Sequence, residues 1–127
     1  MTDIEYAATL WLRARHTGVK VVNELPSTLE QVVPLLFVAH VPGGGDDGIS
    51  GEAALDVQAF AATRTAMWSL AEAAHESMLA MRGRYAGGLA IDDVETDTLP
   101  GFVTYNNPAV RRTVASYRLT RRAPVRI

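Results

Sequence analysis

The chain has no cysteine and a single lysine, Lys20, among its 127 residues. Without cysteine there are no disulfide bonds, zinc–thiolate sites or thiol catalysis. No stretch approaches the roughly 18 consecutive apolar residues that a membrane-spanning helix needs. The N-terminus lacks the basic start and apolar middle of a signal peptide. These absences predict a protein that is made and used in a cytoplasm and has no membrane partner.

The charge balance gives no sign of nucleic-acid binding. The formal net charge is −2, whereas proteins that grip a phosphate backbone carry a clear basic excess. With 48% hydrophobic and 20% charged residues, the composition is that of a globular chain. The length predicts one domain over residues 1–127, with a loose tail at 123–127.

Two strands joined by a polar loop form the most informative segment. Residues 35–41 are almost all apolar, which predicts a central strand that is covered on both faces. Residues 52–59 alternate between apolar and polar, which predicts a neighbouring strand with one solvent-exposed face. The loop between them, PGGGDDGISG, is long for a hairpin, and loops of this length often carry function.

Two helices are predicted, one before these strands and one after them. Residues 3–16 place apolar side chains at helical spacing behind a capping box formed by Thr2 and Glu5. Residues 62–82 form the longest regular element. Its apolar stripe consists of Met67, Leu70, Ala71, Ala74, Met78 and Met81. Trp68 lies on the flank of this stripe, where it either completes the core or anchors a partner.

Three further strands are predicted at residues 19–24, 89–97 and 111–121. Residues 99–110 contain two prolines and paired asparagines, which predicts a loop. The order of helix, strands, long helix and strands predicts an α+β domain. In this domain a mostly antiparallel sheet carries the N-terminal helix and the long helix.

The glycine-rich loop holds two possible binding signals. Residues 43–48 match GxGxxG formally, but a strand pattern follows instead of a helix, so no nucleotide site is predicted. Asp46 and Asp47, alone or with Glu52, are candidates for a calcium site, although their spacing does not match an EF-hand. Solvation of a flexible connector is the alternative, and whether the loop binds an ion stays open.

No catalytic constellation is visible in the sequence. His16, His40 and His75 lie far apart and lack metal-binding spacing. His16 is expected to favour a helix C-terminus through its charge, and His40 to be a hydrogen-bonded histidine of the core or its rim. No serine has the context of a nucleophile elbow. We therefore predict no catalytic residue, no metal and no cofactor, and we do not expect an enzyme.

Two charge patterns lie on the late strands. Acidic residues recur at Asp93, Glu95 and Asp97, and arginines recur at Arg111, Arg112 and Arg118. If the two strands pair antiparallel, acids and arginines meet across the ladder, each pair contributing about 0.2–1 kcal/mol. Alternatively, one of these stripes meets a neighbouring copy of the chain. A third interpretation is an acidic lining that does not grip passing DNA.

With this order of elements, the sequence resembles tail terminator (tail completion) proteins of long-tailed, siphovirus-type phages or prophages. The resemblance covers most of the chain. It rests on the N-terminal helix and on VKVVNELP, PLLFVAHVPGGGDD, ALDVQAFA, ATRTAMWSLAEAAHESMLAMRG and YNNPAVRRTVASYRLTRR. The last segment resembles the family's closing pattern, in which a loop with asparagine and proline leads into an arginine-bearing strand.

The resemblance implies a fold of the lambda-like tail terminator type and a structural role without a cofactor. Such proteins form hexameric rings that end growth of the tail tube and offer a surface for head–tail joining. The implied partners are further copies of the chain, the major tail tube protein and the head–tail connector protein. DNA passes through the ring without sequence-specific binding. The implied location is the virion, at the head–tail junction, after assembly in the host cytoplasm.

The resemblance also implies where assembly residues lie. Asp46 and Asp47 would belong to an exposed assembly loop, and Arg111, Arg112 and Arg118 would lie in or near a subunit interface. Two alternatives stay open from the sequence. One is a head-completion or head–tail adaptor protein of the same particle. The other is a small α+β module that binds a ligand or a peptide.

Overall fold

The computed structural model describes residues 4–42 and 50–122 of the chain. Its elements in chain order are α1 (Ile4–Arg15), β1 (Lys20–Val22), the 3₁₀ turn η1 (Leu29–Gln31), β2 (Leu35–Val41), β3 (Ser50–Ala61), α2 (Arg64–Ala80), β4 (Arg84–Ala86), β5 (Leu89–Phe102) and β6 (Arg111–Arg122). The fold is α+β, as the sequence predicts. None of the described helices is long and apolar enough to cross a membrane.

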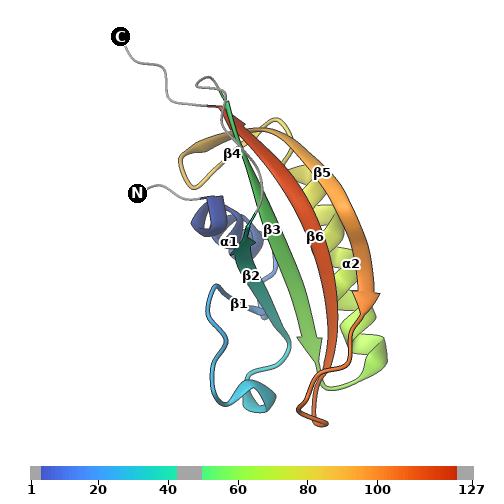
Figure 1. The fold of residues 1–127 in the computed structure, drawn as a ribbon. Coiled ribbons are helices and arrows are strands. Elements are labelled where there is room, and N and C mark those ends of the chain that lie inside the picture. The colour runs from blue at the N-terminus through green and yellow to red at the C-terminus, as the bar shows by residue number, and fades with distance from the viewer. Residues whose placement is uncertain (1–3, 43–49, 123–127) are drawn as a thin grey trace.

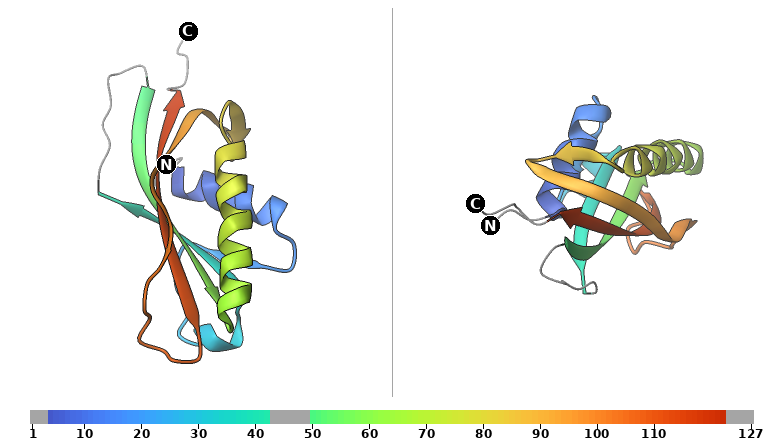
Figure 2. Two further views of the ribbon diagram at one scale, coloured as in Figure 1. Left: turned by 90° about the vertical axis from the view of Figure 1, so that its right-hand side faces the viewer. Right: turned by 90° about the horizontal axis from the view of Figure 1, so that it is seen from above.

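The strands form one sheet in the order β1-β2-β3-β6-β5-β4. Neighbouring strands are antiparallel except β1 and β2, which run parallel. The sheet is strongly curved, and both helices pack on the same face (Figures 1 and 2). The prediction that residues 35–41 form the central strand is wrong, because β3 and β6 occupy the centre.

The main core lies between the two helices and the sheet. β3 alternates as predicted, with Ala53, Leu55, Val57 and Ala59 buried on the helix side. The predicted stripe of the long helix is buried at every position from Met67 to Met81. Residues of β6 complete the core by the same alternation: Thr113, Ala115, Tyr117 and Leu119 are buried. The period of each element therefore matches the face that it buries.

A smaller core covers part of the opposite face of the sheet. Its buried members are Leu29, Leu35, Phe60 and Val110. The ring of Tyr105 meets Phe60 edge-on at 5.2 Å, and Asn107 donates a 3.0 Å hydrogen bond to Glu30. β2 is apolar because Leu35 enters this core while Leu36 enters the main one. A continuous apolar run near the sheet edge is thus explained by two cores, not by a central position.

The rest of this face is mainly polar on β3, β6 and β5, and we call that part the open face. On β2 the same face carries the apolar Ala39 and Val41. The residues of the open face are Glu52, Ala54, Asp56 and Gln58 on β3, Ser116, Arg118, Thr120 and Arg122 on β6, and Glu95 and Asp97 on β5. Most of them lie in the half of the sheet where β3 begins and β6 ends, a region that Figure 1 shows at the top. No described helix covers the open face.

The late strands depart from the predicted boundaries. β5 runs on to Phe102, through part of the segment predicted as a loop. Register shifts between Thr96 and Gly101 act as bulges that let Pro100 sit in the strand. The short strand β4 has no counterpart in the predicted elements, because its three residues lie between glycines, which usually mark a turn.

One edge of the sheet is closed by α1. The Glu5 carboxylate accepts a 2.7 Å hydrogen bond from the backbone N–H of His40. Arg13 Nε donates to the backbone oxygen of Val21 at 2.9 Å. Exposed strand edges invite pairing with other chains, and these two side chains occupy two of the backbone groups that could pair. His40 is exposed at this edge, so the prediction of a core or rim histidine is wrong for its side chain.

The other edge, formed by β4 and β5, is closed differently. β4 pairs with β5 only over Leu89–Ile91. Farther along, Arg82 Nε donates to the backbone oxygen of Val94 at 3.2 Å. Within residues 4–42 and 50–122, no hydrogen bond covers this edge beyond Val94. The bulges and Pro100, which has no N–H, make that stretch a poor template for another strand.

Candidate assembly surface

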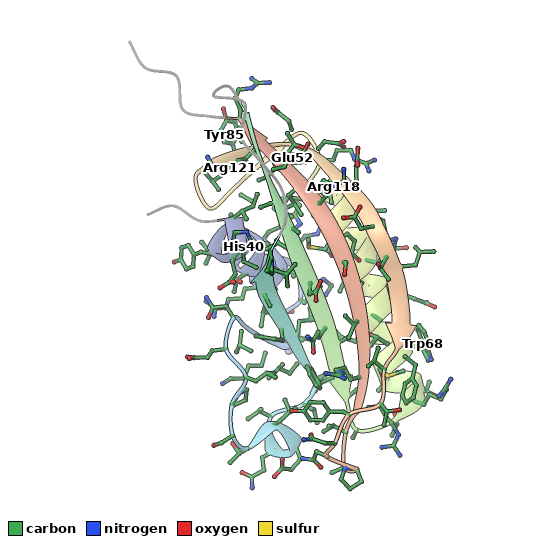
Figure 3. The ribbon with its side chains drawn as sticks, in the orientation of Figure 1. His40, Glu52, Trp68, Tyr85, Arg118 and Arg121 are labelled. Carbon is green, nitrogen blue, oxygen red and sulfur yellow. The ribbon has the colours of Figure 1, made fainter. Side chains whose placement is uncertain are left out.

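The predicted acidic and basic stripes meet on the open face. The antiparallel register places Glu95 of β5 opposite Arg118 of β6. Arg118 Nη2 lies 2.7 Å from an oxygen of Asp97, and Nη1 lies 3.6 Å from an oxygen of Glu95. The hydrogen bond and the charge of Asp97, with the charges of Glu95 and Glu52, raise the pKa of Arg118. Figure 3 shows Glu52 and Arg118 together on this part of the sheet.

Two more acids of β5 are paired with arginines from other elements. Asp93 lies 2.9 Å from Arg82 Nε, just beyond α2. Asp92 lies 3.1 Å from Arg122 Nη2, at the end of β6. Exposed ion pairs such as these contribute little to stability. Their main effect is to neutralise β5 and to hold its side chains in place. The first of the three sequence interpretations, pairing across the ladder, therefore describes the folded chain.

The open face as a whole still carries more acid than base. Four carboxylates, from Glu52, Asp56, Glu95 and Asp97, surround the guanidinium of Arg118. Ser116 donates a 2.8 Å hydrogen bond to Asp56. Gln58 Oε1 is buried without a hydrogen-bond partner in the described part of the chain. This face therefore offers negative charge and hydrogen-bonding groups.

Arg111 and Arg112 lie at the opposite end of β6 from this cluster. Arg111 Nη1 donates to the backbone oxygen of Pro108 at 2.9 Å. Arg112 Nη2 donates to the oxygen of Thr104 at 3.0 Å, and its guanidinium lies 5.0 Å from the Tyr105 ring centre. Six residues of strand separate Arg112 from Arg118, about 20 Å. The predicted arginine stripe is thus two separate groups.

A shallow hollow of about 320 Å³ lies beside Arg111. Its lining consists of Phe102, Thr104, Tyr105, Pro108, Val110 and Arg111. Arg111 is the one charged residue of that lining. A hollow with an aromatic wall and a cation can receive an apolar side chain or a carboxylate, but it brings together no acid–base pair for catalysis.

Trp68 is partly buried and packs against the main core. Figure 3 shows it beside the end of β5, on the side of the sheet that carries α2. Trp68 therefore helps to complete the main core, which is one of its two predicted roles. Its other proposed use, as an anchor for a partner, stays a prediction.

His75 and His16 contact residues between the elements of the fold. His75 Nδ1 lies 2.7 Å from the hydroxyl of the buried Tyr117. His16 Nε2 lies 2.8 Å from Ser77 Oγ, between α1 and α2. Burial, together with the charge of Arg15, lowers the pKa of His16. The prediction that His16 acts as a cation at a helix end is therefore wrong, because its surroundings favour the neutral ring.

The Ser77–His16 contact is the nearest approach to a nucleophile with a base. Ser77 is only 5% exposed, and the hollow described above does not include it. The indole N–H of Trp11 donates to the backbone oxygen of Ser77 at 2.7 Å, so this serine lies in the α1–α2 contact. No carboxylate within the described residues orients His16. The arrangement holds two helices together.

The predicted loop residues Asp46 and Asp47 lie outside the described residues, as does the GxGxxG pattern. Among the residues that are described, no three or more potential metal ligands lie together. Five surface residues have no place in the predictions from the sequence: Arg64, Arg82, Leu99, Phe102 and Val103. A usable signal existed for the last three: they are apolar residues within a segment that otherwise looked like a polar loop.

Comparison with known proteins supports the fold. No protein-family model matches the sequence, and no curated protein matches it. Among solved structures, the chain is similar to one described as "Virion of native gene transfer agent (GTA) particle". The TM-score is 0.69, with 13% identical residues, and the match covers 94% of this chain and 95% of that one. The two chains therefore share their whole fold.

Proposed function

We propose that the chain is a structural protein of a phage-type virion, and specifically a tail terminator. In this role it forms a hexameric ring that ends growth of the tail tube and joins the tail to the head. The observation that carries the proposal is the fold shared, over nearly the full length of both chains, with a chain of a gene transfer agent virion. The sequence resemblance to tail terminators points to the same class.

The chemistry of the surface supports a binding role over a catalytic one. The groups that the described chain presents are ion pairs, exposed apolar side chains and a shallow hollow. Such groups make contacts between proteins. The partners in this proposal are further copies of the chain, the major tail tube protein and the head–tail connector protein. The proposed location is the virion, at the head–tail junction.

The acidic open face fits the wall of a passage for DNA. The four carboxylates around the Arg118 guanidinium give this part of the open face a negative potential. A negative wall repels phosphate, so DNA slides past without being held. In the proposed ring the open face would therefore turn toward the opening.

A head-completion or head–tail adaptor protein is the second candidate. The similarity to a virion chain supports it equally, because that description names the particle and not the position within it. The two candidates differ in what they bind. A terminator binds the end of a tail tube, whereas an adaptor binds a filled head that has no tail.

Electron microscopy of the purified protein, alone and mixed with tail tubes or with tailless heads, tests the proposal. We expect rings, and caps on tube ends that prevent further lengthening when tube protein is added. Caps on heads with bare tube ends would assign the chain to the adaptor class instead. Bare tubes and bare heads at saturating protein would contradict both virion roles.

A further inference from the structure

Exposed apolar side chains gather at the end of β5. Five large hydrophobic side chains are exposed among the described residues, and three of them lie between residues 99 and 103. Leu99 is 68% exposed, and Phe102 and Val103 are each 40% exposed. We call these three residues the β5-end patch. Phe102 lies opposite the buried Thr113, so Phe102 and the adjacent Val103 project to opposite faces of the strand end. Exposed apolar side chains on both faces at this sheet edge make the end of β5 a candidate contact surface.

Arginines without acidic partners surround the β5-end patch. The guanidinium of Arg64 lies 4.9 Å from the Phe102 ring centre. Arg111 lines the hollow that Phe102 also lines, and Arg112 is held by Thr104 and Tyr105. Within the described part of the chain, none of these three forms an ion pair. The arginines that do so, Arg82, Arg118 and Arg122, all pair with acids of β5.

The carboxylates that match this basic rim lie on α2. Glu72 and Glu76 are exposed and one helical turn apart. Like charges at this spacing destabilise a helix slightly, and within residues 4–42 and 50–122 no cation pairs with either. Glu72 lies two turns beyond Arg64, about 12 Å along the helix. The basic rim and the acidic pair of one molecule are therefore too far apart to neutralise each other.

We propose that the β5-end patch and its arginines dock on Glu72 and Glu76 of a second copy of this chain. The contact joins two different surfaces. A copy that uses its β5-end patch therefore still has its acidic pair free for a further neighbour. Apolar side chains supply the contact area, and the opposite charges set its orientation. The setting, a ring of identical subunits, rests on the proposed function.

Charge reversal on each side tests this contact. The first variant combines Arg64→Glu with Arg111→Glu, and the second combines Glu72→Arg with Glu76→Arg. Self-association is measured by sedimentation at low salt over a range of protein concentrations. We expect each variant alone to associate at least about tenfold more weakly than the wild type, because like charges then face each other. A control with Lys20→Glu and Glu24→Arg, both exposed and away from the contact, should associate normally.

Mixing the two reversed variants gives the sharpest readout. In an equimolar mixture every basic rim can again meet an acidic pair, so we expect association to return to the wild-type level. If Arg111→Glu prevents folding, as judged by circular dichroism, Arg64→Glu alone takes its place. A separate single substitution, Leu99→Ser, removes apolar area without changing charge and should also weaken association.

Three results would overturn the inference. They are a wild-type protein that stays monomeric up to about 1 mM, reversals that leave association unchanged, and a mixture that fails to recover. Reversals that spare association but abolish caps on tail tubes would assign the patch to the tube protein instead. Wild-type caps on tubes would still support the proposed function in each case, so the two proposals fail separately.

Discussion

Tyr117 is the largest side chain that is fully buried in the main core, and it carries a polar group into that core. Its hydroxyl lies 2.7 Å from His75 Nδ1, which joins the centre of β6 to α2. Burial raises the pKa of Tyr117 well above its usual value of 10. The phenol therefore stays protonated in the folded protein, and any stability that depends on this is lost only as the pH rises above 10.

Replacing Tyr117 with phenylalanine should lower the free energy of unfolding by about 1 kcal/mol at neutral pH, because one buried hydrogen bond is lost. Urea denaturation of the wild type and the variant measures the difference. Tyr85→Phe is the matched control, since Tyr85 is 77% exposed and its loss of a hydroxyl should have no effect. Equal losses in both variants would show that the His75 contact does not matter.

His16 should make the stability of the protein fall in mild acid. The unfolded chain protonates His16 near pH 6.5, whereas burial and Arg15 hold the folded pKa lower. Between these two values the unfolded state binds more protons, so stability falls as the pH drops through 6.5. The loss of unfolding free energy between about pH 7.5 and pH 5.5 should be smaller in His16→Gln than in the wild type. Identical pH profiles would contradict the lowered pKa.

At the scale of elements, the sequence predicts those helices and strands in which apolar residues recur with a clear period. α2 and the alternating strands β3 and β6 agree with their predicted faces, because the apolar residues of each repeat pack against the main core. The position of β2 in the sheet differs from its prediction, because contact with two cores gives the same apolar run as a central position. The extension of β5 was missed because prolines and asparagines usually mark loops, and the bulges that accommodate Pro100 leave no pattern in the sequence.

The candidate surface was predictable only in part. The ladder between Glu95, Asp97 and Arg118 follows from alternation once the two strands are assumed to pair. The separation of Arg112 from Arg118 follows from strand length, which the sequence also contains. The positions of Arg64 and Arg82 beside β5 could not be predicted. They depend on how α2 crosses the sheet, and local spacing does not encode that crossing.

The turn between β4 and β5 packs closely against α1 at Gly87. Gly87 has φ +55°, and a Cβ built there would lie 2.9 Å from the Ala7 Cα. Gly88 has φ +83° and open space around it. Gly88→Ala should therefore cost only the left-handed strain, about 1–2 kcal/mol.

Gly87→Ala should cost that strain and a further 1–3 kcal/mol, roughly, because α1 must shift to make room. Thermal and urea unfolding of the two variants measure the difference between these adjacent positions. Equal destabilisation would mean that α1 does not rest on this turn.

At the scale of the whole molecule, the two cores share β3 and should unfold together. Phe60→Ala removes the centre of the smaller core and should cost roughly 3–5 kcal/mol. Trp11 and Trp68 both pack against the main core, so their fluorescence reports on the other side of the sheet. We expect fluorescence and circular dichroism to show one shared transition, shifted equally by the substitution. A fluorescence transition that does not move would mean that the two cores are independent.

The closing of one sheet edge by α1 limits how copies of this chain can gather. A bare strand backbone can copy itself without end, because each added strand exposes another like it, and fibrils grow in this way. Here Glu5 and Arg13 each bind one backbone group on one side, and a proline interrupts the other. Neighbours must therefore join through side chains, whose shapes impose a constant angle from one copy to the next. A constant angle that closes on itself gives a countable assembly in place of an unlimited one.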